Sequence, residues 1–326
     1  MSLRPIGTMQ SWQRAFGAVM RFDLLILGDT PDAWRAAEDV ALLGGSVAVL
    51  RPEPEVGDAA FGIPAVLAAY DDAAPSRTSP RLVRPCDLWN EAVRRHERSI
   101  QHMSQSLDVL SWRGRVRLTS CHSASVFDGA VERTFAGDLV LIAVGTTARR
   151  PRGLPFDRRV FLLPEDVPHV TAAPRSLIVL GGNRTACAFA QLFANAGSNV
   201  RIVDSGMSEM NSPPITRVAG DVVELCRETS GVRMRLTNDR AFVADAVLFA
   251  ADRAGATASL NLAAAGLESD EDGRLWCDDN GRTWVPTVRA AGEVVGYPRR
   301  LRDDVNAARR VMADHRRRRA EPFGVG

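Results

Sequence analysis

Two short glycine-containing turns hold the residues whose types and spacing could bind phosphate. The first spans residues 28–33 (GDTPDA), and the second spans residues 181–186 (GGNRTA). Each turn follows a short apolar run and opens a segment with helical periodicity. A glycine at the start of such a turn permits a tight bend, and the free N–H groups of a helix N-terminus attract an anion. The two turns therefore predict binding of a dinucleotide pyrophosphate.

The first turn keeps only part of this pattern. Gly28 holds the first position and Ala33 is a tolerated third position, but Thr30 replaces the second glycine. Its branched side chain stands where the pyrophosphate would pass. Asp29 and Asp32 bring negative charge to the helix N-terminus, where they either compete with a phosphate or cap the helix.

The second turn departs less from the pattern. Gly181 is retained, Ala186 is permitted at the third position, and Asn183 replaces the second glycine. Asparagine is a milder replacement than threonine because it tolerates left-handed backbone angles. Binding of a nucleotide and a purely structural turn both stay open here. We expect the neighbouring Arg184 to be a solvated helix residue.

The strand that follows each turn ends on a different charge. An acid about 20 residues beyond the first glycine accepts hydrogen bonds from a ribose. Asp204 occupies this position after the second turn and favours NAD over NADP. After the first turn the position is Arg51, which cannot accept a hydrogen bond, and Glu53 is the nearby alternative acceptor.

The elements around both turns predict an α/β fold. Residues 22–28 and 46–50 are apolar runs typical of buried strands, and the segment between them has a helical pattern ending at two glycines. The same order recurs over residues 176–204. Residues 87–107 predict a surface helix, and alternating segments elsewhere predict strands. Two such units predict two Rossmann-like three-layer nucleotide-binding domains.

Composition narrows the class of protein. The chain has 326 residues, 45% hydrophobic content and a net charge of +2, so no overall field selects nucleic acid or a membrane. There is no lysine, so all 41 cations are arginine and lysine-dependent mechanisms are excluded. The five cysteines form no C-x-x-C pair and are expected to be reduced, mostly buried thiols. The longest apolar runs are too short to span a bilayer, and we expect a cytoplasmic protein.

Three longer motifs carry a family resemblance. They are LVLIAVGTTARRP at residues 139–151, the segment at residues 245–283, and VRAAGEVVGYP at residues 288–298. In this order, and with the two turns, the chain resembles the pyridine nucleotide-disulfide oxidoreductases, especially their soluble transhydrogenase and dihydrolipoyl dehydrogenase branch. The resemblance runs from about residue 22 to about residue 310.

The resemblance implies a domain layout and two cofactors. Residues 22–150 with 266–326 correspond to an FAD-type domain, residues 151–265 to an NAD-type domain, so that the second domain is inserted in the first, and residues 1–21 to an N-terminal extension. Relatives of this kind pass hydride from a nicotinamide to a flavin. The cofactor-binding positions implied for this chain are Gly28, Thr30, Ala33, Gly145, Gly292 and Glu293 for FAD, and Gly181, Asn183, Ala186 and Asp204 for NAD.

Other positions depart from the family and put the chemistry in question. No cysteine occurs in residues 55–70, where the family has its redox pair, and Ala65 and Val66 replace the serine and lysine that usually follow Pro64. Glu293 replaces an aspartate. Family members continue into an interface domain that builds the dimer, and we expect that domain to be absent because the chain ends at Gly326.

Three functions therefore remain open: a degenerate relative that has lost catalysis and binds or regulates a partner, a reduced flavoprotein that passes electrons from NADH to an unknown acceptor, and a sensor that binds NAD alone.

No catalytic residue is assigned. The histidines form no metal-ligand cluster, and His315 has no carboxylate at a suitable spacing. A helix is expected over residues 303–319, and its basic run 316–319 reads as a helix end decorated with cations.

Overall fold

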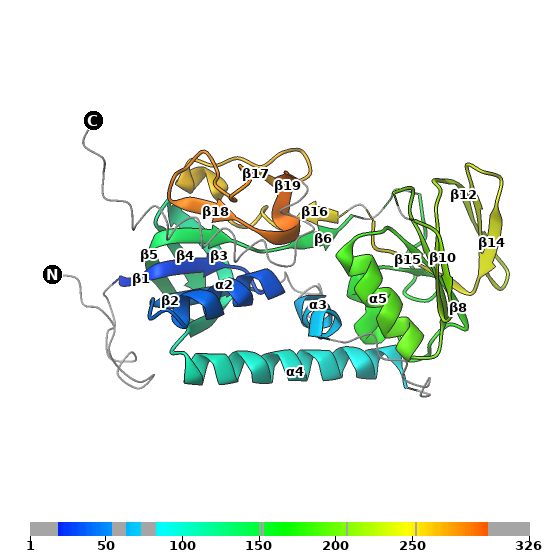
Figure 1. Cartoon of the computed structure of the whole chain (residues 1–326), viewed down its shortest axis with the longest axis horizontal. Helices are drawn as coiled ribbons and strands as arrows, with labels where there is room; N and C mark the ends of the chain where they lie inside the picture. The colour runs from blue at the N-terminus through cyan, green and yellow to red at the C-terminus, as the bar shows by residue number, and fades with distance from the viewer. Residues whose placement is uncertain are drawn as a thin grey trace. The chain divides into compact units, whose positions relative to one another are not determined.

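The structure is a computed structural model. It describes residues 19–53, 63–72, 83–149, 151, 153–206, 208–251 and 253–298. The chain divides into two compact units, shown in Figure 1. Unit 1 comprises Met1–Glu55, Arg98–Thr147 and Ala254–Gly326, and unit 2 comprises Val56–Glu97 and Ala148–Arg253. This division groups residues 56–97 with the second unit, whereas the sequence expectation grouped them with the first domain. The domain assignment by cofactor stays a prediction.

Unit 1 is built on a sheet of five parallel strands and one antiparallel strand. The sheet contains β1 (Met20–Leu27), β2 (Val47–Pro52), β3 (Leu110–Ser120), β4 (Ser123–Phe127), β5 (Glu132–Ile142) and β18 (Val288–Ala290). The parallel part runs in the order β18, β5, β1, β2, β3. The far ends of β3 and β5 pair with β4 as an antiparallel meander. The two long strands thus belong to both parts of the sheet.

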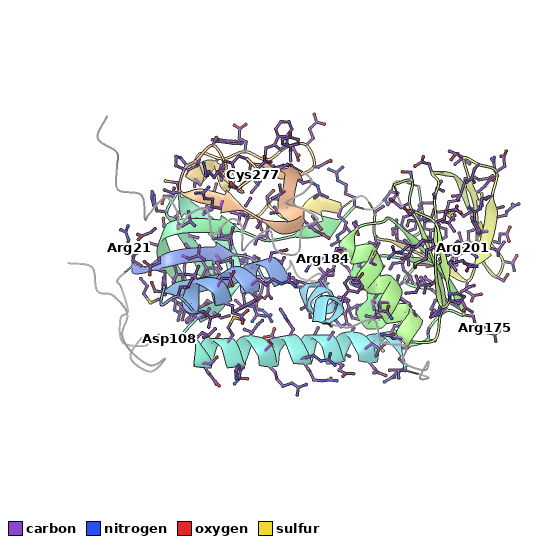
Figure 2. All side chains as sticks on the ribbon, viewed as in Figure 1. Arg21, Asp108, Arg175, Arg184, Arg201 and Cys277 are labelled. Carbon is purple, nitrogen blue, oxygen red and sulfur yellow. The ribbon has the colours of Figure 1, made fainter. Side chains whose placement is uncertain are left out.

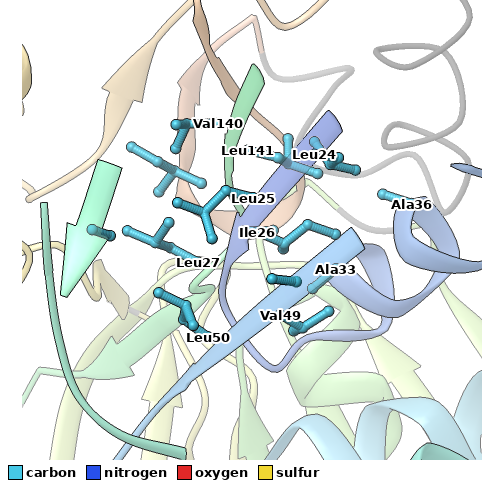
Figure 3. Packing of buried hydrophobic residues seen from close by; sticks show 14 of the residues in the cluster. Leu24, Leu25, Ile26, Leu27, Ala33, Ala36, Val49, Leu50, Val140 and Leu141 are labelled. Carbon is cyan, nitrogen blue, oxygen red and sulfur yellow. The ribbon is translucent and has the colours of Figure 1, made fainter. Parts of the chain in front are cut away.

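Helix α2 (Pro31–Ala41) connects β1 to β2 and packs on the parallel part. Its small buried residues recur at helical spacing, so the helix approaches the sheet closely. Figure 3 shows Ala33 and Ala36 facing the apolar side chains of the first two strands, including Ile26 and Val49. These residues are fully buried, which confirms the predicted strand, helix and strand around the first turn.

The remaining elements of unit 1 are short. They are η3 (Leu262–Ala265), β17 (Leu275–Trp276), η4 (Gly292–Val294) and β19 (Val295–Tyr297). Strand β17 pairs with β19, next to the turn that begins at Gly292. Two strands lie where the chain passes between the units, β6 (Thr146–Ala148) and β16 (Arg253–Gly255).

Unit 2 repeats the architecture with three layers. Its parallel strands are β11 (Ile215–Val218), β9 (Asn199–Val203), β8 (Ser176–Leu180), β15 (Ala246–Phe249) and β7 (Phe161–Leu162), in that order, with β10 (Met210–Ser212) antiparallel at one edge. Helix α5 (Arg184–Asn195) packs on one face. The other face carries an antiparallel meander of β12 (Val222–Glu228), β13 (Gly231–Leu236) and β14 (Ala241–Ala244).

Two further helices precede this sheet in the chain. Helix α3 (Ile63–Asp72) packs against α5, and α4 (Pro85–Ser106) matches the helix predicted over residues 87–107. A short turn of 3₁₀ helix, η2 (Pro164–His169), follows β7. Within the described residues, no helix is both long and apolar enough to cross a membrane. The predicted α/β fold with Rossmann-like units is confirmed.

Candidate nucleotide sites

The first glycine of each turn is required by packing. Gly28 has φ +148°, and a Cβ atom there would lie 2.1 Å from the carbonyl oxygen of Ala143. Gly181 has φ +111°, and its Cβ atom would lie 2.8 Å from the nitrogen of Ala251. No L side chain fits either position without moving the backbone. These glycines are therefore needed for the fold whether or not a ligand binds.

Thr30 closes the N-terminus of α2. It is the N-cap residue, and its Oγ1 accepts a hydrogen bond from the backbone N–H of Ala33 at 3.3 Å. The same hydroxyl donates to the carbonyl oxygen of Ala143 at 2.9 Å. Thr30 is buried, and its methyl carbon faces Gly145, where a Cβ would lie 3.0 Å away. A side chain of the protein thus already occupies part of the helix N-terminus where an anion would bind.

Asp29 and Arg51 form a buried ion pair next to this cap. Arg51 Nε lies 2.9 Å from Asp29 Oδ1, and both side chains are less than a tenth exposed. Trp34 Nε1 donates to the same oxygen at 2.9 Å, and the Arg113 guanidinium reaches Oδ2 at 3.4 Å. The Arg51 guanidinium also lies 5.8 Å from the Trp34 ring centroid. The Asp29 carboxylate is thus held by two cations and an indole N–H.

The pairing of β1 with β2 explains why these residues meet. The N–H of Gly28 donates to the carbonyl of Leu50 at 2.9 Å, so Asp29, just after β1, comes beside Arg51, near the end of β2. The sequence analysis treated Asp29 as a cap or a competitor of phosphate and Arg51 as a missing acid. Thr30 is the cap instead, and the two charges neutralise each other. Opposite charges at the carboxyl ends of two adjacent parallel strands are the signal that would have predicted the pair.

The Gly292 turn lies against the first helix turn. Gly292 has φ +77°, and a Cβ there would lie 2.5 Å from Asp32 Oδ2, so the buried Asp32 carboxylate fills the space beside it. The Glu293 carboxylate accepts a hydrogen bond from Thr146 Oγ1 at 2.6 Å. Gly145, with φ +71°, directly precedes Thr146. The structure thus gathers all six residues that the sequence predicted for the first site.

The second turn has the same backbone plan. The N–H of Gly181 donates to the carbonyl of Val203 at 2.9 Å, which makes Asp204 the structural counterpart of Arg51. Asn183 is the N-cap of α5: its Oδ1 accepts from the N–H of Ala186 at 2.8 Å, and its Nδ2 donates to the carbonyl of Ala250 at 2.8 Å. Asn183 therefore has the same two contacts as Thr30.

The surroundings of the second turn are more open. Gly182 has no side chain where the first turn has Asp29, and Asp204 is half-buried. The Asp204 carboxylate accepts a hydrogen bond from the N–H of Gly206 at 3.0 Å. Arg184, half-buried, lies at the start of α5, as Figure 2 shows, so it is less solvated than expected. All four residues predicted for the NAD site lie around this one turn.

Cys187 lies on α5 one turn beyond the cap. Burial raises the pKa of its thiol, against the guanidinium of Arg217 and a hydrogen bond with Tyr70, while the Asp204 carboxylate adds to the increase. Such a thiol stays protonated and is a poor nucleophile at neutral pH. Sequence inspection assigned this cysteine no role, because its neighbours come from α3 and β11.

The cysteines as a group differ from one expectation. All five are free thiols, but only Cys86 is buried, and the other four are partly exposed. Burial and the neighbouring Asp278 raise the pKa of Cys277 to about 12. Ala65 and Val66, at the positions where the family has a serine and a lysine, are buried in the apolar core of unit 2. Neither Ala65 nor Val66 carries a reactive group.

Several predicted features lie outside the described residues. They are most of the segment expected to hold the redox pair, His315, the basic run 316–319 and the helix expected over 303–319. Within the described residues, no three His, Cys, Asp or Glu side chains gather as a metal site.

The two turns differ in their fit to a dinucleotide. At the first turn, the Thr30 side chain occupies the N–H of Ala33 at the helix N-terminus, and the carboxylates of Asp29 and Asp32 add negative charge close to it. That turn does not fit FAD in this conformation. At the second turn, the Asp204 carboxylate can accept hydrogen bonds from a ribose. The Asn183 side chain, which caps the helix, is the group that lies where the pyrophosphate would bind.

Comparisons with known proteins agree with this architecture. The sequence matches the pyridine nucleotide-disulphide oxidoreductase family over residues 22–311. Soluble pyridine nucleotide transhydrogenase of Mycobacterium tuberculosis is 25% identical over 315 residues, covering 85% of this chain and 67% of the relative. The enzyme of the same name from Aliivibrio fischeri is 26% identical over 312 residues, covering 85% and 66%. The chain thus spans about two thirds of the length of these relatives.

Solved structures share the fold. LpdA from Mycobacterium tuberculosis superimposes with a TM-score of 0.62 at 19% identity, covering 91% of this chain and 72% of that chain. The HOCl-induced flavoprotein disulfide reductase RclA from Escherichia coli gives a TM-score of 0.59 at 20% identity, covering 93% and 72%. The family match over most of the sequence, supported by this shared fold, shows that the chain belongs to the pyridine nucleotide-disulphide oxidoreductase family.

Proposed function

We propose that this chain binds NAD through the turn at residues 181–186 and does not perform the flavin-to-disulfide chemistry of its family. The observation that carries the proposal is the contrast between the half-buried Asp204 and its counterpart Arg51, which is buried in an ion pair. A dinucleotide-binding unit needs an acid at this position for the ribose. Only the second unit keeps one.

Two features support NAD as the nucleotide rather than NADP. A carboxylate at the end of the second strand accepts hydrogen bonds from the 2′- and 3′-hydroxyls of the adenosine ribose. The same charge repels a 2′-phosphate. In this arrangement Asp204 orients the ribose, and the backbone around Gly182 approaches the pyrophosphate. The Asn183 side chain gives up its hydrogen bond with the N–H of Ala186, which makes room for the pyrophosphate.

The loss of disulfide chemistry follows from side chains that are missing or buried. Cysteine-based electron transfer needs a thiolate beside the flavin, and residues 55–70 contain no cysteine. Ala65 and Val66 are part of a packed apolar core. Cys187, the cysteine near the second turn, has a raised pKa because it is buried. The chain would therefore act as a nucleotide-responsive binding or regulatory protein.

Thermal unfolding with added nucleotides tests the proposal. A ligand that binds only the folded state at 100 times its dissociation constant stabilises a protein by about 2.7 kcal/mol. We expect NAD⁺ or NADH to raise the melting temperature and NADP⁺ to have a much smaller effect. Isothermal titration calorimetry then gives the dissociation constant. No response to NAD⁺ or NADH at millimolar concentration would contradict the proposal.

A matched pair of variants locates the site. Asp204→Ala is expected to weaken NAD binding about tenfold, because it removes a charged hydrogen-bond acceptor worth about 1.5–3 kcal/mol. Asp221→Ala, a change at another exposed carboxylate of the same unit, is the control and is expected to leave NAD affinity unchanged. Equal affinities in both variants would place the nucleotide elsewhere.

A reduced flavoprotein is the second candidate. The observation in its favour is the preserved Gly292 turn, with its positive φ and with Glu293 hydrogen-bonded to Thr146. This candidate predicts a yellow protein whose flavin band bleaches on anaerobic addition of NADH. A visible spectrum of the protein purified with FAD supplied throughout separates it from the first proposal.

A further inference from the structure

The side chains at the first turn already supply what a bound dinucleotide supplies in such a fold. We propose that the buried ion pair of Asp29 and Arg51, held by Trp34, takes the place of the FAD pyrophosphate and ribose, so that unit 1 keeps its fold without flavin and excludes the cofactor. The proposal concerns unit 1 and does not depend on NAD binding by unit 2.

The charges at this site are the reverse of those that a dinucleotide requires. In such a fold the pyrophosphate lies at the helix N-terminus, where negative charge is unfavourable to it, and the ribose is bound by an acid at the end of the second strand. This chain has the carboxylate in the turn, at Asp29, and the cation at the strand end, at Arg51. The resident carboxylate therefore repels the phosphates, and the resident guanidinium offers the ribose hydroxyls no acceptor.

Displacing the pair would separate two opposite charges that are both buried. Asp29 and Arg51 are 8% and 6% exposed, so neither side chain reaches bulk water when the pair is broken. The carboxylate would also lose the N–H of Trp34 and the guanidinium of Arg113. Breaking a buried pair is strongly unfavourable because the ions are not rehydrated. The ion pair of Asp29 and Arg51 therefore stays in place at the first turn and keeps the cofactor out of it.

Two neighbouring contacts close the rest of the path. Thr30 uses its hydroxyl to accept from the N–H of Ala33 and to donate to the carbonyl of Ala143, so one donor of the helix N-terminus is already taken. On the other side, the Asp32 carboxylate lies against Gly292 and adds a second negative charge. Both contacts come from residues that replace or flank the glycine positions of the turn. Exclusion of the cofactor is thus built from several side chains acting together.

The second turn is an internal control for this argument. Gly182, Asn183 and Asp204 occupy the positions of Asp29, Thr30 and Arg51, as the strand register shows. There, no acid lies in the turn and no cation lies at the strand end. The same backbone plan therefore occurs once with the internal ion pair and once without it.

The test restores the first turn to the cofactor-binding pattern. The triple variant Asp29→Gly, Thr30→Gly and Arg51→Glu removes the ion pair, opens the turn and provides an acid for the ribose. FAD binding is measured by fluorescence quenching of the flavin and by the flavin absorbance that remains after desalting. We expect wild-type protein to retain no flavin and the triple variant to bind FAD at least tenfold more tightly.

A matched control carries the same three kinds of change outside the turn: Arg117→Glu and Thr119→Gly on β3, and Asp128→Gly directly after β4. This control is expected to bind no FAD. A folded triple variant, verified by circular dichroism, that binds FAD no better than wild type overturns the proposal.

A measurement on the unaltered protein keeps the proposal testable if the triple variant does not fold. Wild-type protein is purified and melted with excess FAD. One flavin per chain after desalting, or a melting temperature raised by FAD, overturns the proposal. Absence of both supports it. A parallel sample with NAD⁺ reads the second unit separately, so failure of NAD binding is distinguished from failure of flavin exclusion.

Discussion

The two glycine turns share one backbone plan and differ in what fills it. In both, the first glycine is bonded to the end of the second strand, and the third residue caps the helix. Thr30 and Asn183 even bond the equivalent carbonyls, those of Ala143 and Ala250. The first turn adds a buried ion pair, whereas the second leaves an accessible acid. A dinucleotide fold can therefore keep its turn geometry when internal contacts replace the ligand.

The largest expected effect comes from the two equivalent strand ends. Arg51→Ala removes one of the two cations that hold the buried Asp29 carboxylate, and because Arg113 and Trp34 remain it should lower the free energy of unfolding by at most about 3–5 kcal/mol. Asp204→Ala at the counterpart position should change it by about 0.5 kcal/mol, because Asp204 is half-exposed. Urea unfolding followed by circular dichroism measures both values.

A double-mutant cycle sharpens this comparison. If Asp29 and Arg51 stabilise each other, the double variant Asp29→Ala and Arg51→Ala should be destabilised by less than the sum of the two single variants. Additive effects would mean that the pair contributes no mutual stabilisation and that the two turns differ less than proposed. Arg21→Ala, which removes an exposed ion pair with Asp138, is the matched control and should change stability by under about 1 kcal/mol.

The helix caps should give an intermediate effect. Thr30→Ala and Asn183→Ala each remove an N-cap, and a lost cap costs about 1 kcal/mol. Thr30 is the more deeply buried of the two, so its loss should cost more. Asn183→Gly should cost only a few tenths of a kcal/mol, since glycine is a fair N-cap. The same urea titrations, run side by side, measure these differences.

The caps also separate the two turns by function. Asn183→Gly opens the second turn and is expected to leave NAD binding intact or to tighten it. Thr30→Gly alone is expected to give no FAD binding, because Asp29 and Arg51 stay in place. FAD binding by Thr30→Gly alone would show that the cap, rather than the ion pair, excludes the cofactor.

The smallest expected effect concerns the thiol beside the second turn. Burial raises the pKa of Cys187, so at pH 8 less of it is thiolate than in an unfolded chain. Alkylation by iodoacetamide, followed by mass spectrometry, should be slower at Cys187 in native protein than in urea. The native rate should rise steeply as the pH passes the ordinary cysteine range. Equal rates in the two states at pH 8 would contradict the shift.

The raised pKa of Cys187 also makes the stability of the folded protein depend on pH. The native state holds the Cys187 proton more tightly than the unfolded state does, so its contribution is fully present below about pH 8.5 and is lost as pH rises through the native pKa. Cys187→Ser would remove this dependence. The pH profile of its melting temperature is therefore expected to be flatter than that of wild type at alkaline pH.

The sequence by itself determined the architecture. Apolar runs that end in glycine, followed by helical periodicity, predicted both strand, helix and strand units, and the structure confirms them. Asp204 was recognised from its spacing alone, because the distance between a turn and the end of the next strand is fixed by one intervening helix. Burial of most cysteines was predicted wrongly, since a thiol's exposure depends on which elements pack over it.

Only the tertiary structure decided how the charges at the first turn are used. Asp29 and Arg51 are separated by a helix in the sequence and meet because β1 and β2 pair in parallel register. Asp32 reaches Gly292 because β18 joins the same sheet on the far side of β5. Residue types gave the charges, but an ion pair depends on distance and burial. Distance and burial are both set by the register between paired strands, and that register cannot be read from the sequence of either strand alone.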